Sequence, residues 1–138
     1  MAGPHFLAPL LKGRDSSAAL AIDRGATPAP TLATVVELAA DSAARKRGLL
    51  GRNGLAAGHA LVIAPCNGVH TFAMRFAIDV IFAARDGRVV KIARAVPARR
   101  IAFAVGAFAA IEMASGEAER AGLAVGDRLV VTQAIEEP

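Results

Sequence analysis

The sequence predicts a mainly β domain of the α+β class: a compact antiparallel or mixed β-barrel-like fold with two short helices. Short runs rich in Val, Ile, Leu and Phe recur along the chain, and tight-turn sequences such as Asp86-Gly87 separate them. Long helical patterns that could cross over a parallel sheet are missing, which argues against a doubly wound α/β fold. A chain of 138 residues fits one domain.

Residues 1–30 show no sustained apolar period and contain the proline-rich run Ala26–Pro30. We therefore expect a poorly ordered N-terminal arm, followed by a single β-rich domain over residues 31–135. Apolar residues in this arm, Phe6 and Leu7 among them, could pack across the domain.

The first half of the domain reads as strand, helix, strand. Thr31–Leu38 is rich in β-branched residues and predicts a strand. Asp41 is a candidate N-cap for a short basic helix over Ala43–Arg47, and Gly48 ends that helix. The apolar run His59–Ala64 predicts a central strand.

The second half is predicted to be mostly extended. Residues 101–108 alternate apolar residues with Ala and Gly, and they fit a strand, a loop or a distorted helix. Val69–Met74 is expected to be extended, and Ile78–Ala84 and Val89–Ala95 are expected to form a hairpin about Asp86-Gly87. A short helix is expected at Glu117–Ala121 and a last strand at Arg128–Ala134.

The amino-acid composition argues against several classes of binding protein. The chain lacks Trp and Tyr, which argues against recognition of bases or sugars by stacking, and the Arg residues behind its net charge of +4 are scattered, so nucleic-acid binding is not expected. A small anionic or polar ligand fits this charge better. No apolar run is long enough for a membrane helix, and no basic region precedes the short apolar run at the N-terminus. We expect a cytoplasmic protein that does not enter a membrane.

Three soft or borderline ligands, Cys66, His70 and Met74, form a candidate metal site for Cu(I) or Zn(II). Their spacing weakens this copper-binding hypothesis, because four residues along a strand span about 13 Å. A two-residue hairpin at Asn67-Gly68 would also place Cys66 and His70 on opposite faces. In the alternative, Cys66 is a buried small apolar residue and Met74 fills the core.

Cys66, His70 and Asp79 contain the residue types of a thiol- or metal-assisted hydrolase, since a carboxylate can orient an imidazole that activates a thiol. In the simpler interpretation, Asp79 accepts hydrogen bonds from the backbone or from Arg at the start of a strand.

Arg47, Arg52 and Arg75 could form an anion pocket, where Gly48 and Gly51 would let backbone N–H groups approach a ligand. Alternatively, these Arg side chains are solvated. Glu112 is a lone carboxylate among apolar residues, and we expect it to pair with an Arg, since an unpaired buried charge is costly.

Several motifs occur together in one order, and the set resembles the family catalogued as domain of unknown function 192, over Thr31–Thr132. They are Arg47-Gly48-Leu49-Leu50-Gly51-Arg52, His70-Thr71-Phe72-Ala73-Met74, Ile78-Asp79-Val80-Ile81-Phe82, Asp86-Gly87-Arg88-Val89-Val90 and Gly122-Leu123-Ala124-Val125-Gly126-Asp127. The resemblance implies a small, mostly β domain with short helices and no established reaction. Many relatives have Phe-Trp-Met and an export signal where this chain has Phe-Ala-Met and no evident signal, so it looks like a cytoplasmic variant.

Together these observations favour a small non-enzymatic ligand-binding or interaction module without a resident cofactor. Its polar site is expected around His70, Asp79 and the segment Arg47–Arg52, with Arg75 nearby. The hydrolase and the copper-binding protein stay as alternatives.

Overall fold

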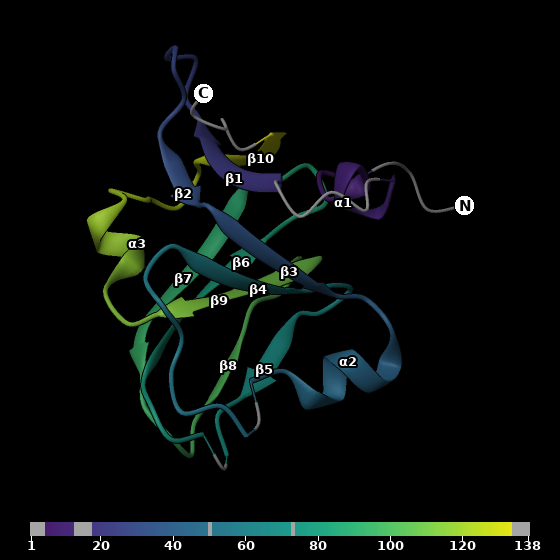
Figure 1. The fold of residues 1–138 in the computed structure, drawn as a ribbon, viewed down its shortest axis with the longest axis vertical. Coiled ribbons are helices and arrows are strands. Elements are labelled where there is room, and N and C mark those ends of the chain that lie inside the picture. The colour runs from purple at the N-terminus through teal and green to yellow at the C-terminus, as the bar shows by residue number, and fades with distance from the viewer. Residues whose placement is uncertain (1–4, 13–17, 50, 73, 134–138) are drawn as a thin grey trace.

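The computed structural model describes residues 5–12, 18–49, 51–72 and 74–133. Within these ranges the chain forms three sheets with three short helices around them (Figure 1). The helices are α1 Ala8–Lys12, α2 Ser42–Arg47 and α3 Glu117–Arg120. The strands are β1 Ala18–Asp23, β2 Thr31–Ala33, β3 Val35–Ala39, β4 His59–Ile63, β5 Gly68–His70, β6 Ile78–Ala83, β7 Val89–Val96, β8 Ile101–Phe103, β9 Ala109–Ala114 and β10 Arg128–Gln133.

A five-stranded sheet in the order β3-β4-β9-β6-β7 lies at the centre of the molecule. Strands β3 and β4 are parallel and the other neighbours are antiparallel. Every residue of β6 is buried, so both faces of the sheet are covered there. Because side chains alternate along a strand, Ile81 and Phe82 enter two separate cores.

The first face packs against the three-stranded sheet β10-β1-β2, as Figure 1 shows. Its core includes Leu7, Leu20, Ile22, Leu32, Val62, Ile81, Val89, Ile111, Met113, Leu123 and Leu129. The second face is covered by the two-stranded sheet β5-β8 and by the chain that leaves α2. Its core includes Leu49, Leu61, Ile63, Met74, Ile78, Val80, Phe82 and Val96.

The N-terminal region differs from the expected arm in the parts that are described. Strand β1 is the middle strand of its sheet, paired with β10 from Ala18↔Gln133 to Asp23↔Arg128. Leu7 is fully buried in the first core. The strand was not predicted because its Ala-rich sequence carries little local β signal; its partner β10 lies at the other end of the chain.

The predicted strand over residues 31–38 is interrupted at Thr34, where the chain passes from one sheet to another. Strand β2 pairs with β1, whereas β3 pairs with β4. The predicted hairpin about Asp86-Gly87 is confirmed, and Gly87 has a φ of +91°. A Cβ atom at Gly87 would collide with the carbonyl oxygen of Leu129, so only glycine fits there.

One further expectation needs correction, and one geometry considered for the metal site does not occur. The sheets do not close into a barrel, because each has two separate edge strands. Asn67-Gly68 does not form a two-residue hairpin, because β5 pairs with β8, with His70 opposite Ile101. This pairing also shows that part of the ambiguous region 101–108 is a strand. The longest helix within the described ranges has six residues, and none of those helices could span a bilayer.

Asp79, near the start of β6, joins three elements through its buried carboxylate. Oδ1 accepts a hydrogen bond of 2.9 Å from the backbone N–H of Ala95, next to the end of β7. Oδ2 accepts bonds of 3.2 Å and 2.9 Å from the N–H groups of Gly116 and Ala118 at α3. The simpler interpretation of Asp79 as a backbone hydrogen-bond acceptor is therefore confirmed.

Replacing this carboxylate tests its structural role. We expect Asp79→Ala to lower the free energy of unfolding by about 2–4 kcal/mol, since three N–H groups lose a charged acceptor. Urea denaturation measures the change. Glu119→Ala, which alters an exposed carboxylate on α3, is the matched control. Equal stability of the two variants would contradict the assignment.

Candidate functional site

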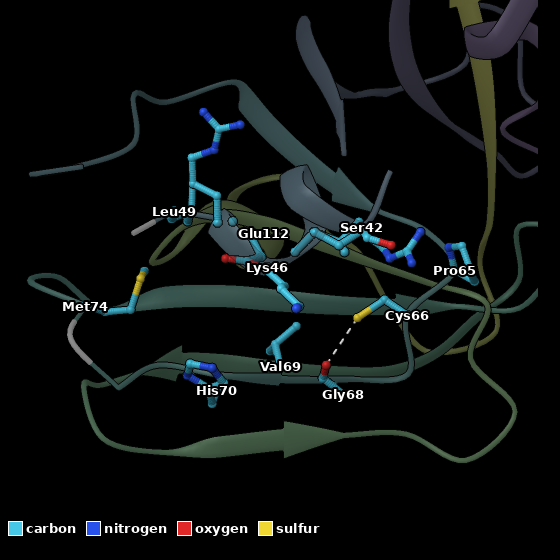
Figure 2. A pocket seen from close by; sticks show the side chains of 14 residues that line it. Ser42, Lys46, Leu49, Pro65, Cys66, Gly68, Val69, His70, Met74 and Glu112 are labelled. Carbon is cyan, nitrogen blue, oxygen red and sulfur yellow. Dashed lines mark hydrogen bonds between the residues drawn. The ribbon is translucent and has the colours of Figure 1, made fainter. Parts of the chain in front are cut away.

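A cleft of about 580 Å³ lies between α2 and β5, over the end of β4 and the middle of β9 (Figure 2). It opens on the face of the central sheet that carries the second core. Its lining residues come from α2 and its exit, the end of β4, β5, the segment before β6, and β9. They are Ser42, Arg45, Lys46, Arg47, Gly48, Leu49, Ile63, Pro65, Cys66, Gly68, Val69, His70, Met74 and Glu112.

Local capping places the helix that forms one wall. The Asp41 carboxylate accepts a hydrogen bond of 2.8 Å from the N–H of Ala44, which is a standard N-cap. Gly48, with a φ of +47°, ends the helix and donates its N–H to the carbonyl of Ala44. A Cβ at Gly48 would lie 4.0 Å from Oε1 of Glu112, so the helix end approaches the carboxylate in the cleft floor.

The wall is basic. Arg45, Lys46 and Arg47 line the cleft, and none of them forms an ion pair with a described residue. Arg45 donates from Nη1 to the carbonyl oxygen of Ala40 at 2.5 Å. Figure 2 shows the Lys46 side chain extending across the cleft toward Val69. Three consecutive basic residues of the helix therefore contribute to the lining, and Lys46 extends into the cleft.

Glu112 lies in the floor, on β9, and only 5 % of its surface is exposed. Two other carboxylates of the described chain are buried, and both have partners: Asp79 binds three N–H groups, and Glu117 pairs with Arg120 and accepts the N–H of Gly58. Glu112 forms neither a hydrogen bond nor an ion pair with any described residue. Burial raises its pKa to about 7, against an opposing effect of the Arg52 charge.

The expected pairing of Glu112 with an Arg is therefore wrong, and the reason is competition. Arg52 binds Glu37 on β3 instead, through two hydrogen bonds of 2.9 Å. Arg75 also lies outside the cleft lining, where it donates to Asn53 Oδ1 at 2.8 Å. Of the three Arg residues predicted to form an anion pocket, only Arg47 lines the cleft.

The predicted Cys66, His70 and Asp79 constellation is not assembled. Asp79 shares a face of the central sheet with Met113, its partner in register, whereas Glu112 and the cleft lie on the opposite face. The thiol of Cys66 donates to the carbonyl oxygen of Gly68 at 3.1 Å. His70 is exposed, and its ring stacks on Phe72 with centroids 5.4 Å apart. No described contact joins the thiol to the imidazole.

Cys66, His70 and Met74 all line the cleft, but they do not form a compact set of ligands. Figure 2 shows Cys66 and Met74 at opposite ends of the cleft. In the part of the chain that is described, no three His, Cys, Asp or Glu side chains are grouped closely enough to hold a metal ion. The geometry therefore gives no support to a preformed metal centre that includes both Cys66 and Met74.

Sequence reasoning missed Ser42, Arg45 and Lys46 as cleft residues. The run Arg45-Lys46-Arg47 carried a signal, since three consecutive cations on a capped helix form a local concentration of positive charge. Glu112 carried another signal as a single charge in the apolar run Ala109–Ala114. Only the tertiary structure shows that the basic run and Glu112 line the same cleft.

The fold and the cleft define a small mainly β domain of the α+β class with a basic-walled cleft over a buried carboxylate. The chain belongs to the DUF192 family, described as "Uncharacterized ACR", whose model matches residues 25–131. Comparison with curated proteins gives no match.

Two crystal structures share the fold. One is a protein of unknown function from Novosphingobium aromaticivorans, 24 % identical, with a TM-score of 0.69 over 80 % of this chain and 82 % of the other. The second, from Sinorhizobium meliloti, is described as a proposed transcription regulator. It is 23 % identical, with a TM-score of 0.71 over 85 % of this chain and 96 % of the other. At this identity the likeness shows the fold alone.

The raised pKa of Glu112 makes stability depend on pH. Between the ordinary value of 4.5 and about 7, the folded chain keeps a proton that the unfolded chain releases, so the free energy of unfolding falls as pH rises. We expect Glu112→Gln to remove this fall. Relative to wild type, the variant should gain about 3 kcal/mol between pH 4.5 and 7.5, measured by urea denaturation. Glu119→Gln is the control, and parallel curves for wild type and Glu112→Gln would contradict the assignment.

Burial also raises the pKa of the Cys66 thiol above its ordinary value of 9.0. We expect alkylation of this single cysteine by iodoacetamide to have a pH midpoint above 9 in the folded protein and an ordinary midpoint in guanidinium chloride. Mass spectrometry of the time course measures both. A folded-state midpoint near 7 would instead indicate the activated thiolate that the hydrolase hypothesis requires.

Proposed function

We propose that this protein is a small binding module that takes an anionic ligand in the cleft between α2 and β5. The observation that carries this proposal is the basic wall: Arg45, Lys46 and Arg47 line the cleft, and none forms an ion pair with a described residue. Basic side chains that line a concave site without forming an ion pair favour an anion in that space.

The size and lining of the cleft support a small-molecule ligand. Its volume of about 580 Å³ lies within the range of typical ligand sites, roughly 300–1,000 Å³. Guanidinium groups such as those of Arg45 and Arg47 can bind carboxylate or phosphate oxygens in pairs, and the Lys46 ammonium adds a mobile point charge. Apolar side chains, Ile63 and Val69 among them, can contact the rest of the ligand.

Binding is favoured over hydrolysis because, among the described residues that line the cleft, none has the features of an activated nucleophile. The Cys66 thiol is bonded to a carbonyl oxygen and has a raised pKa, whereas a catalytic thiolate needs a lowered one. The carboxylate that was expected to orient His70 serves the backbone on the other face of the sheet. The cytoplasmic location stays a prediction.

Anion binding is tested by titrating the protein with inorganic phosphate, citrate and glutarate, followed by the amide shifts of the cleft residues in NMR spectra. We expect at least one of these anions to shift the amides of α2 and β5. Lys46→Gln or Arg47→Gln should weaken that binding about tenfold, because each removes a charged contact.

Arg88→Gln is the matched control. It removes one positive charge from an exposed residue outside the cleft, so it should leave the affinity unchanged. An equal loss in all three variants would mean that the anion responds to net charge only, and the proposal would fail.

A further inference from the structure

The floor of the cleft has the opposite charge preference to its wall. Glu112 is 95 % buried, and among the described residues it is the buried carboxylate without a hydrogen-bond or ion-pair partner. A carboxylate removed from water is costly unless donors or a cation compensate it. The protein provides such partners for Asp79 and Glu117 and leaves Glu112 facing the cleft.

We infer that the ligand of this cleft carries, besides its anionic group, a cationic nitrogen or a set of N–H donors that binds the Glu112 carboxylate. This inference rests on the proposed function and specifies the class of ligand. An anion alone would satisfy the basic wall but would be repelled by an ionised Glu112. A ligand with both groups satisfies the wall and the floor together.

The two recognition groups are close enough for one small molecule. Arg47 is followed directly by Gly48, and a Cβ at Gly48 would lie only 4.0 Å from Oε1 of Glu112. The wall and the floor therefore meet at the end of α2. Gly48 and Glu112 both line the cleft at this point.

Several charged or titratable groups surround Glu112. Arg45, Lys46 and Arg47 line the cleft from α2, Cys66 from the segment after β4 and His70 from β5, while the Arg52 charge also acts on Glu112. With a pKa of about 7, Glu112 changes from a neutral to an ionised carboxyl group near neutral pH. Affinity for a donor group should therefore rise with pH, whereas affinity for a simple anion should not.

Two kinds of molecule have this chemistry. Amino acids and short peptides combine a carboxylate with an ammonium group. Guanine nucleotides combine a phosphate with neighbouring N–H donors on the base edge, which a carboxylate accepts in pairs. The shared feature is an acidic oxygen group at one end and nitrogen donors at the other.

The experiment compares matched probes that differ in the donor. Glutamate and glutarate differ by an ammonium group, and GMP and AMP differ in the donors of the base. Each is titrated at pH 8 and pH 5.5 into wild type, Glu112→Gln and the control Glu119→Gln, with affinity measured by NMR. We expect one donor-bearing probe to bind about tenfold more tightly than its partner at pH 8. The pair that shows this preference identifies the source.

The preference should persist in Glu119→Gln and disappear in Glu112→Gln, which keeps the shape of the side chain and removes its charge. It should also shrink at pH 5.5 in wild type. Equal binding of both members of each pair, still weakened by Arg47→Gln, would overturn this inference and leave anion binding intact. If none of the four probes binds, and neither phosphate nor citrate binds, both this inference and the proposed function would be overturned.

Discussion

Burial of the central sheet on both faces is the constraint on which this structure depends. Strands β6 and β9 are covered above and below, so each alternating set of side chains needs its own core. The three-stranded sheet, together with Leu7 and α3, packs on one face. The other face is covered by smaller pieces, β5-β8 and the exit of α2, and the cleft opens between them. The candidate site thus lies on the second face of the central sheet, between the two separate segments that cover this face.

The three buried carboxylates differ in whether the described chain provides them with a partner. Asp79 and Glu117 serve backbone groups and Arg120, and they fix α3 against its neighbours. Glu112 lies on the face of the central sheet where the cleft opens, and Arg52, whose charge acts on it, is bound to Glu37. Because this ion pair holds Arg52, its charge acts on Glu112 without a hydrogen bond to it. The local structure therefore leaves Glu112 without a hydrogen-bond or ion-pair partner among the described residues.

Local signals predicted much of the fold. Asp41 and Gly48 defined α2, and Asp86-Gly87 defined the hairpin of β6 and β7, because caps and tight turns depend on neighbouring residues. Strand β1 and the break at Thr34 depend on pairing with distant segments, which local patterns do not encode. Local patterns were insufficient for the site for the same reason. Arg47 and Glu112 were each recognisable in the sequence, but their proximity depends on the tertiary structure, and so does the pairing of Arg52 with Glu37.

The single cysteine lies in the cleft lining and offers a unique site for covalent attachment. Cys66 is half-buried at one end of the lining, and its thiol is the only one in the sequence. Thiol-bearing fragments can therefore be tethered there by a disulfide without engineering a new residue or removing an old one. Every captured fragment is attached at the same sulfur atom. Fragments of different length and charge can therefore be compared for how well they occupy the space next to α2 and Glu112.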